Sequence, residues 1–122
     1  MSHIVTIQTQ VRSFDGISAA CRRLELLEPT VGEAKLFTSR ATGVIVRLPE
    51  WRFPVVFDLD AATIQFDNYK GAWGKQEHLD RFLQAYSIET AKLEARKKGY
   101  SVTETSLKDG SVKLVVHVGG AA

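Results

Sequence analysis

The residues best suited to metal binding are few and scattered along this chain. The sequence holds the histidines His3, His78 and His117, and no two of them stand at a spacing such as H-x-x-x-H. That spacing would place two zinc ligands on one face of a helix. His3 and His117 can meet only if their strands are neighbours in the sheet. We therefore predict no metal site, and we expect neither a cofactor nor a catalytic residue.

The single cysteine, Cys21, could act as a nucleophile only if a nearby base or cation lowered its pKa. Cys21 instead belongs to a stripe of apolar residues at helical spacing, between Ile17 and Leu24. No histidine or cation is evidently directed at it. We expect Cys21 to be a small buried side chain of the core.

Asp58, Asp60 and Asp67 could act as paired carboxylates. Asp58 and Asp60 are two residues apart and can share one face of a strand. General acid–base chemistry needs a raised pKa, which in turn needs a buried neighbourhood. Asp60 also fits a turn before Ala62, because aspartate readily accepts hydrogen bonds from nearby backbone N–H groups. A structural role for these aspartates is therefore favoured over a catalytic one.

The segment Tyr69–Gly74, YKGAWG, combines two aromatic residues with a lysine and two glycines. Aromatic side chains in a basic, glycine-bearing loop can stack on the bases of single-stranded nucleic acid, or on a peptide. Alternatively, Trp73 only fixes the start of the next helix on the sheet. A further tryptophan, Trp51, lies between two prolines, in a segment predicted to be a surface loop or a sheet edge. The candidate binding residues are Trp51, Tyr69, Lys70 and Trp73.

Charge and motifs argue against several classes of protein. The formal net charge is only +2, whereas nucleic-acid-binding domains usually carry a larger basic excess. The run Arg96-Lys97-Lys98 suits the C-terminal end of a helix, where cations match the dipole. The sequence contains no P-loop, G-x-G-x-x-G, H-E-x-x-H, C-x-x-C or G-x-S-x-G pattern. These absences lower the odds of a nucleotide-dependent or familiar hydrolytic enzyme.

The length of 122 residues fits one domain, so we expect a single domain over 1–122 with a loose tail at 119–122. Hydrophobic residues at 44% and charged residues at 25% are ordinary values for a globular protein. No apolar run approaches the roughly 20 residues that span a bilayer. The lone cysteine and the alternating first ten residues, which do not resemble a secretory signal, favour a cytoplasmic protein or one inside an organelle.

Periodicity predicts strands and two helices in alternation. Strands are expected at 3–11, 42–48, 54–59 and 62–66, with an ambiguous one at 33–38. The first helix should begin at an Asp15 N-cap and end by Pro29; the second should cover 76–98 and stop at Gly99. The pair Asp109-Gly110 predicts a hairpin between strands at 101–107 and 112–118. This order indicates an α+β fold, in which an antiparallel-rich sheet packs both helices on one face, ferredoxin-like with extra strands.

Several stretches together resemble the domain-of-unknown-function family numbered 1257, whose plastid and cyanobacterial members are called hypothetical chloroplast reading frame 35 proteins. The residues that carry the resemblance are Met1–Thr9, Gly71–Gly74, Ala85-Tyr86, Lys92, Gly99–Val102, Asp109–Val112 and Leu114–Val116. Members of that family often carry a tryptophan-rich motif with a Trp-Trp pair before the long helix, whereas this chain has Ala72 before Trp73. The family has no established activity. Its members are said to occur beside genes for AAA-type ATPases, so the resemblance implies an ATPase as partner.

The leading hypothesis is an accessory or adaptor domain that binds another protein and has no catalytic activity. One alternative is a single-stranded nucleic-acid-binding module that uses the Tyr69–Trp73 loop. Another is a small-molecule-binding domain, or an enzyme of unrecognised type, with a pocket between the sheet and the long helix. The sequence leaves the oligomeric state open, and a homo-oligomer is suggested only by the analogy that ferredoxin-like domains often pair through their sheets. No membrane partner is predicted.

Overall fold

The computed structural model describes residues 4–118. The predicted loose tail at 119–122 and the histidine His3 lie outside the described residues. The elements are β1 (Val5–Gln8), α1 (Phe14–Arg23), β2 (Thr30–Lys35), β3 (Arg40–Val46), β4 (Val55–Asp58), β5 (Thr63–Phe66), a short 3-10 turn η1 (Tyr69–Gly71), α2 (Gln76–Lys97), β6 (Ser101–Ser106) and β7 (Val112–His117).

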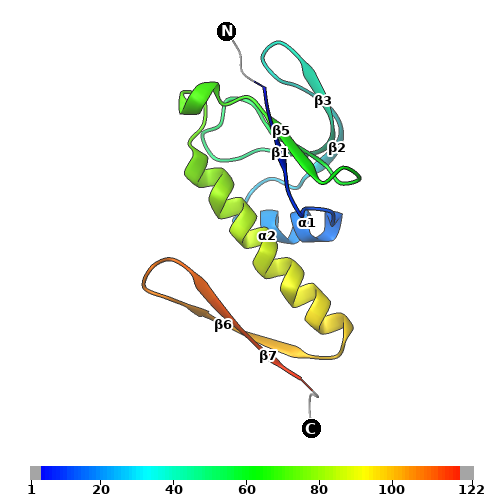
Figure 1. Cartoon of the computed structure of the whole chain (residues 1–122), viewed down its shortest axis with the longest axis vertical. Helices are drawn as coiled ribbons and strands as arrows, with labels where there is room; N and C mark the ends of the chain where they lie inside the picture. The colour runs from blue at the N-terminus through cyan, green and yellow to red at the C-terminus, as the bar shows by residue number, and fades with distance from the viewer. Residues whose placement is uncertain (1–3, 119–122) are drawn as a thin grey trace.

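The main sheet has five strands in the order β1-β5-β4-β3-β2, and every neighbouring pair is antiparallel. Strands β2 to β5 form a meander, and β1 closes the sheet beside β5, with Val5 opposite Phe66. Both helices lie on the same side of this sheet (Figure 1). The predicted α+β class is therefore confirmed.

One face of the sheet and the two helices share a single apolar core. Alternation along β4 turns Val55 and Phe57 toward the helices, where Phe57 meets Phe82 of α2 with ring centroids 5.6 Å apart. Ile17 of α1 is fully buried in the same core. The two helices approach each other closely at Gly16: a Cβ atom at this position would overlap Tyr86 and Thr90 of α2. Burial on this scale makes the core the main source of stability.

A second, smaller cluster lies on the other face of the sheet. It contains Ala34, Leu36, Ala41 and Val56, and Phe53 packs against it. Leu36 is fully buried although it follows the end of β2. This cluster supports the base of the aromatic loop described below.

The C-terminal strands β6 and β7 form a separate two-stranded sheet, whereas a ferredoxin-like arrangement would bring a C-terminal strand into the main sheet. The 22 residues of α2 extend about 33 Å, while strands of four to seven residues extend only about 13–23 Å. The chain therefore leaves α2 beyond the sheet, and the two strands pair with each other (Figure 1).

Four charged side chains connect α1, α2 and this hairpin. The Arg23 guanidinium binds both carboxylate oxygens of Glu104, at 3.0 and 2.7 Å, and also contacts Glu89 at 3.0 Å. The Lys92 ammonium lies 2.7 Å from Glu104 and 3.5 Å from Glu89. We call these four residues the ionic network. Hydrogen bonds from Arg23 and Lys92 lower the pKa of Glu104 to about 2.

Several predicted boundaries and roles are corrected by the structure. The N-cap of α1 is Ser13, whose hydroxyl accepts from the Gly16 N–H, and Asp15 lies in the first turn. The helix ends at Arg23, well before Pro29. The ambiguous strand lies at Thr30–Lys35 rather than 33–38, because its register is set by pairing with β3.

The turn between β4 and β5 also differs from the prediction. The aspartate that accepts a backbone hydrogen bond there is Asp58, from the Ala61 N–H at 3.0 Å, and not Asp60. In the part of the chain that the structure describes, no helix is long and apolar enough to cross a membrane.

Candidate functional site

Residues 67–75, which we call the aromatic loop, connect β5 to α2. The loop folds back on itself: the Trp73 N–H donates to the Asn68 carbonyl at 2.9 Å, and the Asn68 amide donates to the Gly74 carbonyl at 3.1 Å. The Arg52 N–H donates to the Trp73 carbonyl at 2.8 Å and so joins the loop to the segment before β4. These bonds place Trp73 and its neighbours in one arrangement on the surface.

Trp73 is the centre of an aromatic cluster. Tyr69 stacks on its ring with centroids 4.7 Å apart, and Phe37 and Phe53 meet it edge-on at 5.0 and 5.6 Å. The Arg52 guanidinium lies over the same ring, 4.8 Å from its centroid. Tyr69 and Phe37 are each 39% exposed, a high value for side chains of their size. We call Phe37, Arg52, Tyr69 and Trp73 the aromatic surface.

The other two predicted binding residues take different positions. Trp51 packs edge-on against Phe66 of the main core, at 5.5 Å, and its ring lies where a Cβ atom on Gly74 would be. Its indole N–H donates to the Lys75 carbonyl at 3.0 Å. Trp51 thus anchors the start of α2 and does not join the aromatic surface. Lys70 is exposed beside Tyr69.

The aromatic loop holds two unfavourable features. Tyr69 and Lys70 have φ angles of 48° and 54°, in the left-handed region, which costs about 1–2 kcal/mol for each non-glycine residue. Asp67 is 1% exposed, and its Oδ2 atom has no hydrogen-bond partner among the described residues, while its Oδ1 atom accepts from the Tyr69 N–H. Strain and unmet hydrogen bonds concentrate at functional sites, because selection for stability alone would remove them.

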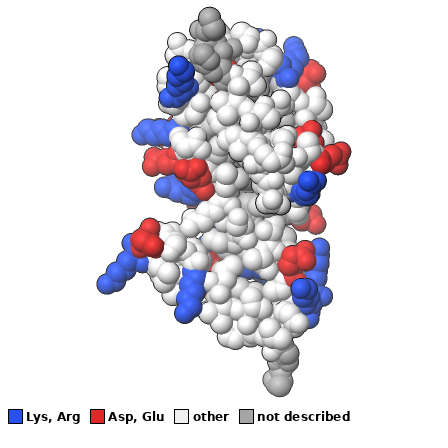
Figure 2. Space-filling model, viewed as in Figure 1, with Lys and Arg blue, Asp and Glu red and all other residues white. Residues whose placement is uncertain are grey.

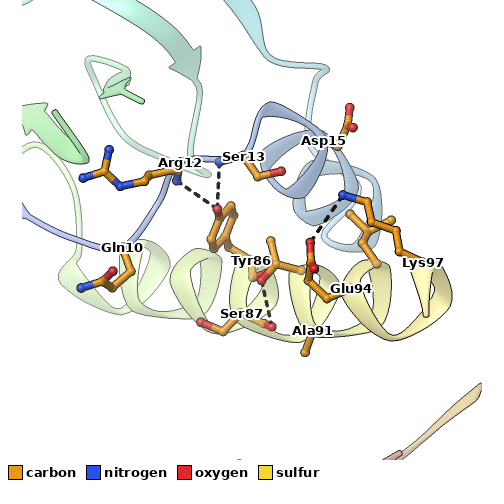
Figure 3. Close-up of a pocket in the computed structure, with 11 residues that line it drawn as sticks. Gln10, Arg12, Ser13, Asp15, Tyr86, Ser87, Ala91, Glu94 and Lys97 are labelled. Carbon is orange, nitrogen blue, oxygen red and sulfur yellow. Dashed lines mark hydrogen bonds and ion pairs between the residues drawn. The ribbon is translucent and has the colours of Figure 1, made fainter. Parts of the chain in front are cut away.

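A second feature is an open cleft of about 510 Å³ between α2 and the segment that joins β1 to α1. Its lining includes Ser13, Tyr86, Ser87 and Lys97. Figure 3 shows the Tyr86 ring directed from α2 toward that segment, where its hydroxyl accepts from the Arg12 and Ser13 N–H groups at 3.1 Å each. The hydrogen of this hydroxyl therefore remains available to an acceptor in the cleft.

The cleft is balanced in charge. Lys97 contacts Glu94 at 3.4 Å, and the Arg12 guanidinium donates to the Asp60 carbonyl at 2.8 Å. Figure 3 shows the Arg12 side chain extending away from Ser87 and Glu94. The cleft thus offers hydroxyl and amide groups rather than a concentrated charge.

Two further residues that the sequence singled out, Cys21 and His117, lie apart from the aromatic surface and the cleft. Cys21 is 1% exposed, and burial raises the pKa of its thiol to about 11, so the predicted core position is confirmed. His117 is exposed on β7, and its Nε2 atom lies 2.9 Å from the Thr103 hydroxyl. Within residues 4–118, no group of three or more His, Cys, Asp or Glu side chains could hold a metal ion.

Sequence reasoning missed Phe37, Phe53 and Arg52 of the aromatic cluster. Arg52 and Phe53 follow Trp51 directly, but strand alternation would place Trp51 and Phe53 on one face and Arg52 on the other, so it could not have assigned Arg52 and Phe53 to one cluster without Trp51. Phe37 gave no signal, because it lies in the turn after β2, a strand whose limits the sequence left open.

Comparison with known proteins adds no relative. No protein-family model, no curated protein and no solved structure matches the chain. The resemblance to the domain-of-unknown-function family 1257 therefore stays a prediction, and the function must be argued from the site itself.

Proposed function

We propose that this chain is an accessory domain that binds another protein through the aromatic surface. The supporting observation is the pair of exposed rings, Tyr69 and Phe37, which pack against Trp73, while the Arg52 guanidinium lies over the Trp73 ring. Aromatic residues and arginine are enriched at the energetic centres of protein interfaces. Rings fixed before binding also lose little conformational entropy when a partner covers them.

The unfavourable features of the aromatic loop support the same proposal. A loop that served only to connect β5 with α2 would gain stability from glycine at position 70 and from a neutral residue at position 67. The retained Lys70 and Asp67 are consistent with a loop shaped for contact with a partner. An AAA-type ATPase, which the family resemblance implies, is the first partner class to look for, in a cytoplasmic lysate.

The proposal is tested by quantitative affinity capture of the full chain from native lysate, followed by mass spectrometry. The test variant combines Phe37→Ser with Tyr69→Asn, since asparagine tolerates the left-handed backbone at position 69. The matched control is Leu27→Ser, which removes a 73% exposed apolar side chain outside the aromatic surface. A stoichiometric protein should be captured by the wild type and the control and lost from the test variant. Equal capture by the wild type and both variants would refute the aromatic surface as the binding site.

The cleft favours a second candidate function, the binding of a small polar molecule. Its volume of about 510 Å³ is within the range of ligand pockets, and Tyr86 can donate a hydrogen bond into it. A thermal-shift screen of small polar metabolites should raise the Tm of the wild type. The variant Ser87→Trp should abolish that shift by filling the cleft, while Val31→Trp, on an exposed part of β2, should retain it. No shift with any compound would dismiss this candidate.

The nucleic-acid alternative would have to use the outer rings of the aromatic surface for stacking. The Trp73 ring is already covered by Tyr69 and Arg52 of its own chain, so a base could stack only on the outer rings. Titration with single-stranded oligonucleotides at low salt should leave tryptophan fluorescence unchanged. Strong quenching that disappears with added salt would restore the alternative.

A further inference from the structure

The two edges of the main sheet differ in how they are protected. Natural sheets shield exposed edges with charged residues, prolines or bulges, because an unpaired strand can pair with another chain. The edge strand β2 carries Glu33 and Lys35, and Glu33 contacts Arg40 at 3.1 Å. The edge strand β1, with the sequence VTIQ, has no charge and no proline, and it pairs with β5 in unbroken register. Strand β1 is the unprotected edge.

The ladder between β1 and β5 shows which backbone groups face outward. The Thr9 N–H donates to the Ala62 carbonyl at 2.7 Å, so the odd-numbered residues of this strand bond to β5. The N–H and C=O groups of Thr6 and Gln8 therefore point away from the sheet. Within residues 4–118, no strand lies on that side of β1.

The side chains of β1 are suited to an apolar continuation of the sheet. Val5 and Ile7 pack against the main core but are only partly buried, because the core ends at this edge. Thr6, on the other face, is exposed and uncharged. Figure 2 shows that the middle of this face of the molecule, over β1, is free of charged side chains, which gather along the two sides.

We propose that β1 is the dimerisation edge of this protein and pairs antiparallel with β1 of a second copy about a two-fold axis at Thr6. Residues directly opposite each other in an antiparallel pair lie on the same face of the sheet, whereas consecutive residues of one strand lie on opposite faces. A two-fold axis between two consecutive residues would place those two residues opposite each other, so the axis must pass through a residue. The outward backbone groups of Thr6 make it the residue that exchanges hydrogen bonds with Thr6 of the partner subunit.

This register is self-complementary, which favours a second copy over an unrelated peptide. Val5 lies opposite Ile7 of the partner subunit, so the two partly buried side chains of each copy extend the core across the axis. Thr-Thr and β-branched pairs are favourable cross-strand neighbours, and no like charges meet. The result is one continuous sheet through both copies, closed by the commonest symmetry of soluble oligomers.

The test measures the dimer dissociation constant of the full chain by sedimentation equilibrium. The wild type should form dimers, and Thr6→Lys should raise the dissociation constant by at least about tenfold, because it places two ammonium groups opposite each other. Position 6 is exposed, so the fold should survive, as circular dichroism will show. The matched control Val31→Lys places the same charge on the opposite edge strand and should leave the dimer unchanged.

A charge-exchange experiment tests the register itself. Thr6→Glu alone should also be monomeric, and an equimolar mixture of Thr6→Lys with Thr6→Glu should restore dimers, because opposite charges then meet at the axis. A wild type that stays monomeric, a Thr6→Lys variant that still dimerises, or a mixture that remains monomeric would each overturn the proposal. The aromatic surface is not used here, so Phe37→Ser should dimerise normally, and the two proposals can fail independently.

Discussion

The two ends of α2 are held by different forces. At the N-terminal end, Leu79 and Phe82 are fully buried against the main sheet. At the C-terminal end, Glu89 and Lys92 belong to the ionic network that joins the helix to β6 through Glu104. Apolar burial is insensitive to pH, whereas the attraction of ion pairs depends on both pH and salt. The helix α2 therefore links the stable main sheet to a hairpin whose attachment depends on pH and salt.

This contrast implies different local stabilities. An isolated two-stranded hairpin is at best marginally stable in water, so β6 and β7 depend on their contacts with α2. We expect the hairpin to open at a lower free energy than the main sheet, as separate cooperative units do in native proteins.

Phe82→Ala should reduce the free energy of unfolding by about 3–5 kcal/mol, because it leaves a cavity beneath Phe57. Urea denaturation followed by circular dichroism measures the loss. The control Gln84→Ala removes an exposed side chain on the same helix, with only one hydrogen bond to Gly110, and should cost much less. Similar losses in the free energy of unfolding for both variants would contradict the interpretation that apolar burial stabilises the N-terminal end of α2.

Gly16→Ala should destabilise the protein by about 1–3 kcal/mol, because the new methyl group would overlap Tyr86 and Thr90 at the contact between the helices. The matched change Gly110→Ala meets no atom within 4 Å and strains only the hairpin turn, where φ is 88°. Thermal unfolding should show a lower Tm of the main transition for Gly16→Ala, and hydrogen exchange should localise the Gly110→Ala effect to the hairpin.

Glu104→Gln should weaken the attachment of the hairpin by about 1 kcal/mol or less, because its partners are only partly buried. The pKa of Glu104 is lowered from 4.5 to about 2, so its stabilising effect is complete above pH 4.5 and is lost as the pH falls toward 2. The protection factors of amides in β6 and β7, which correct for the intrinsic slowing of exchange in acid, should fall in the wild type over that pH range. The variant should show the lower protection factors already at neutral pH, and these should change less with pH.

Lys70→Gly, in the loop before the N-terminal end of α2, should raise the free energy of unfolding by about 0.5 kcal/mol. Glycine accepts the φ of 54° without strain, and its greater freedom in the unfolded chain offsets only part of that gain. Lys113→Gly, in the strand β7, should instead be destabilising. The midpoint of urea denaturation should rise for Lys70→Gly and fall for Lys113→Gly. A destabilising Lys70→Gly would mean that the lysine side chain itself supports the aromatic loop.

Local patterns predicted the elements better than the candidate site. The 3.6-residue period placed α2 at 76–98 and the Asp109-Gly110 pair placed the final hairpin, both within one residue of the structure. The limits of α1 and β2 were less accurate, because a hydroxyl cap and a pairing register depend on partners that a single window does not contain. For the site, Tyr69 and Trp73 were found from composition, whereas Phe37 and the cleft required the assembled fold.

The sequence by itself determined the α+β class, the burial of Cys21 and the position of the aromatic loop, because each depends on the order of residues within a few turns or strands. Tertiary structure alone decided that Trp51 joins the core while Trp73 meets Phe37. It also decided that Asp67 is buried with an oxygen that has no partner among residues 4–118, and that β1 is an edge strand of the main sheet. These outcomes depend on which distant segments become neighbours. That choice is set by burying the most apolar surface of the whole chain at once, a condition that no short stretch of sequence contains.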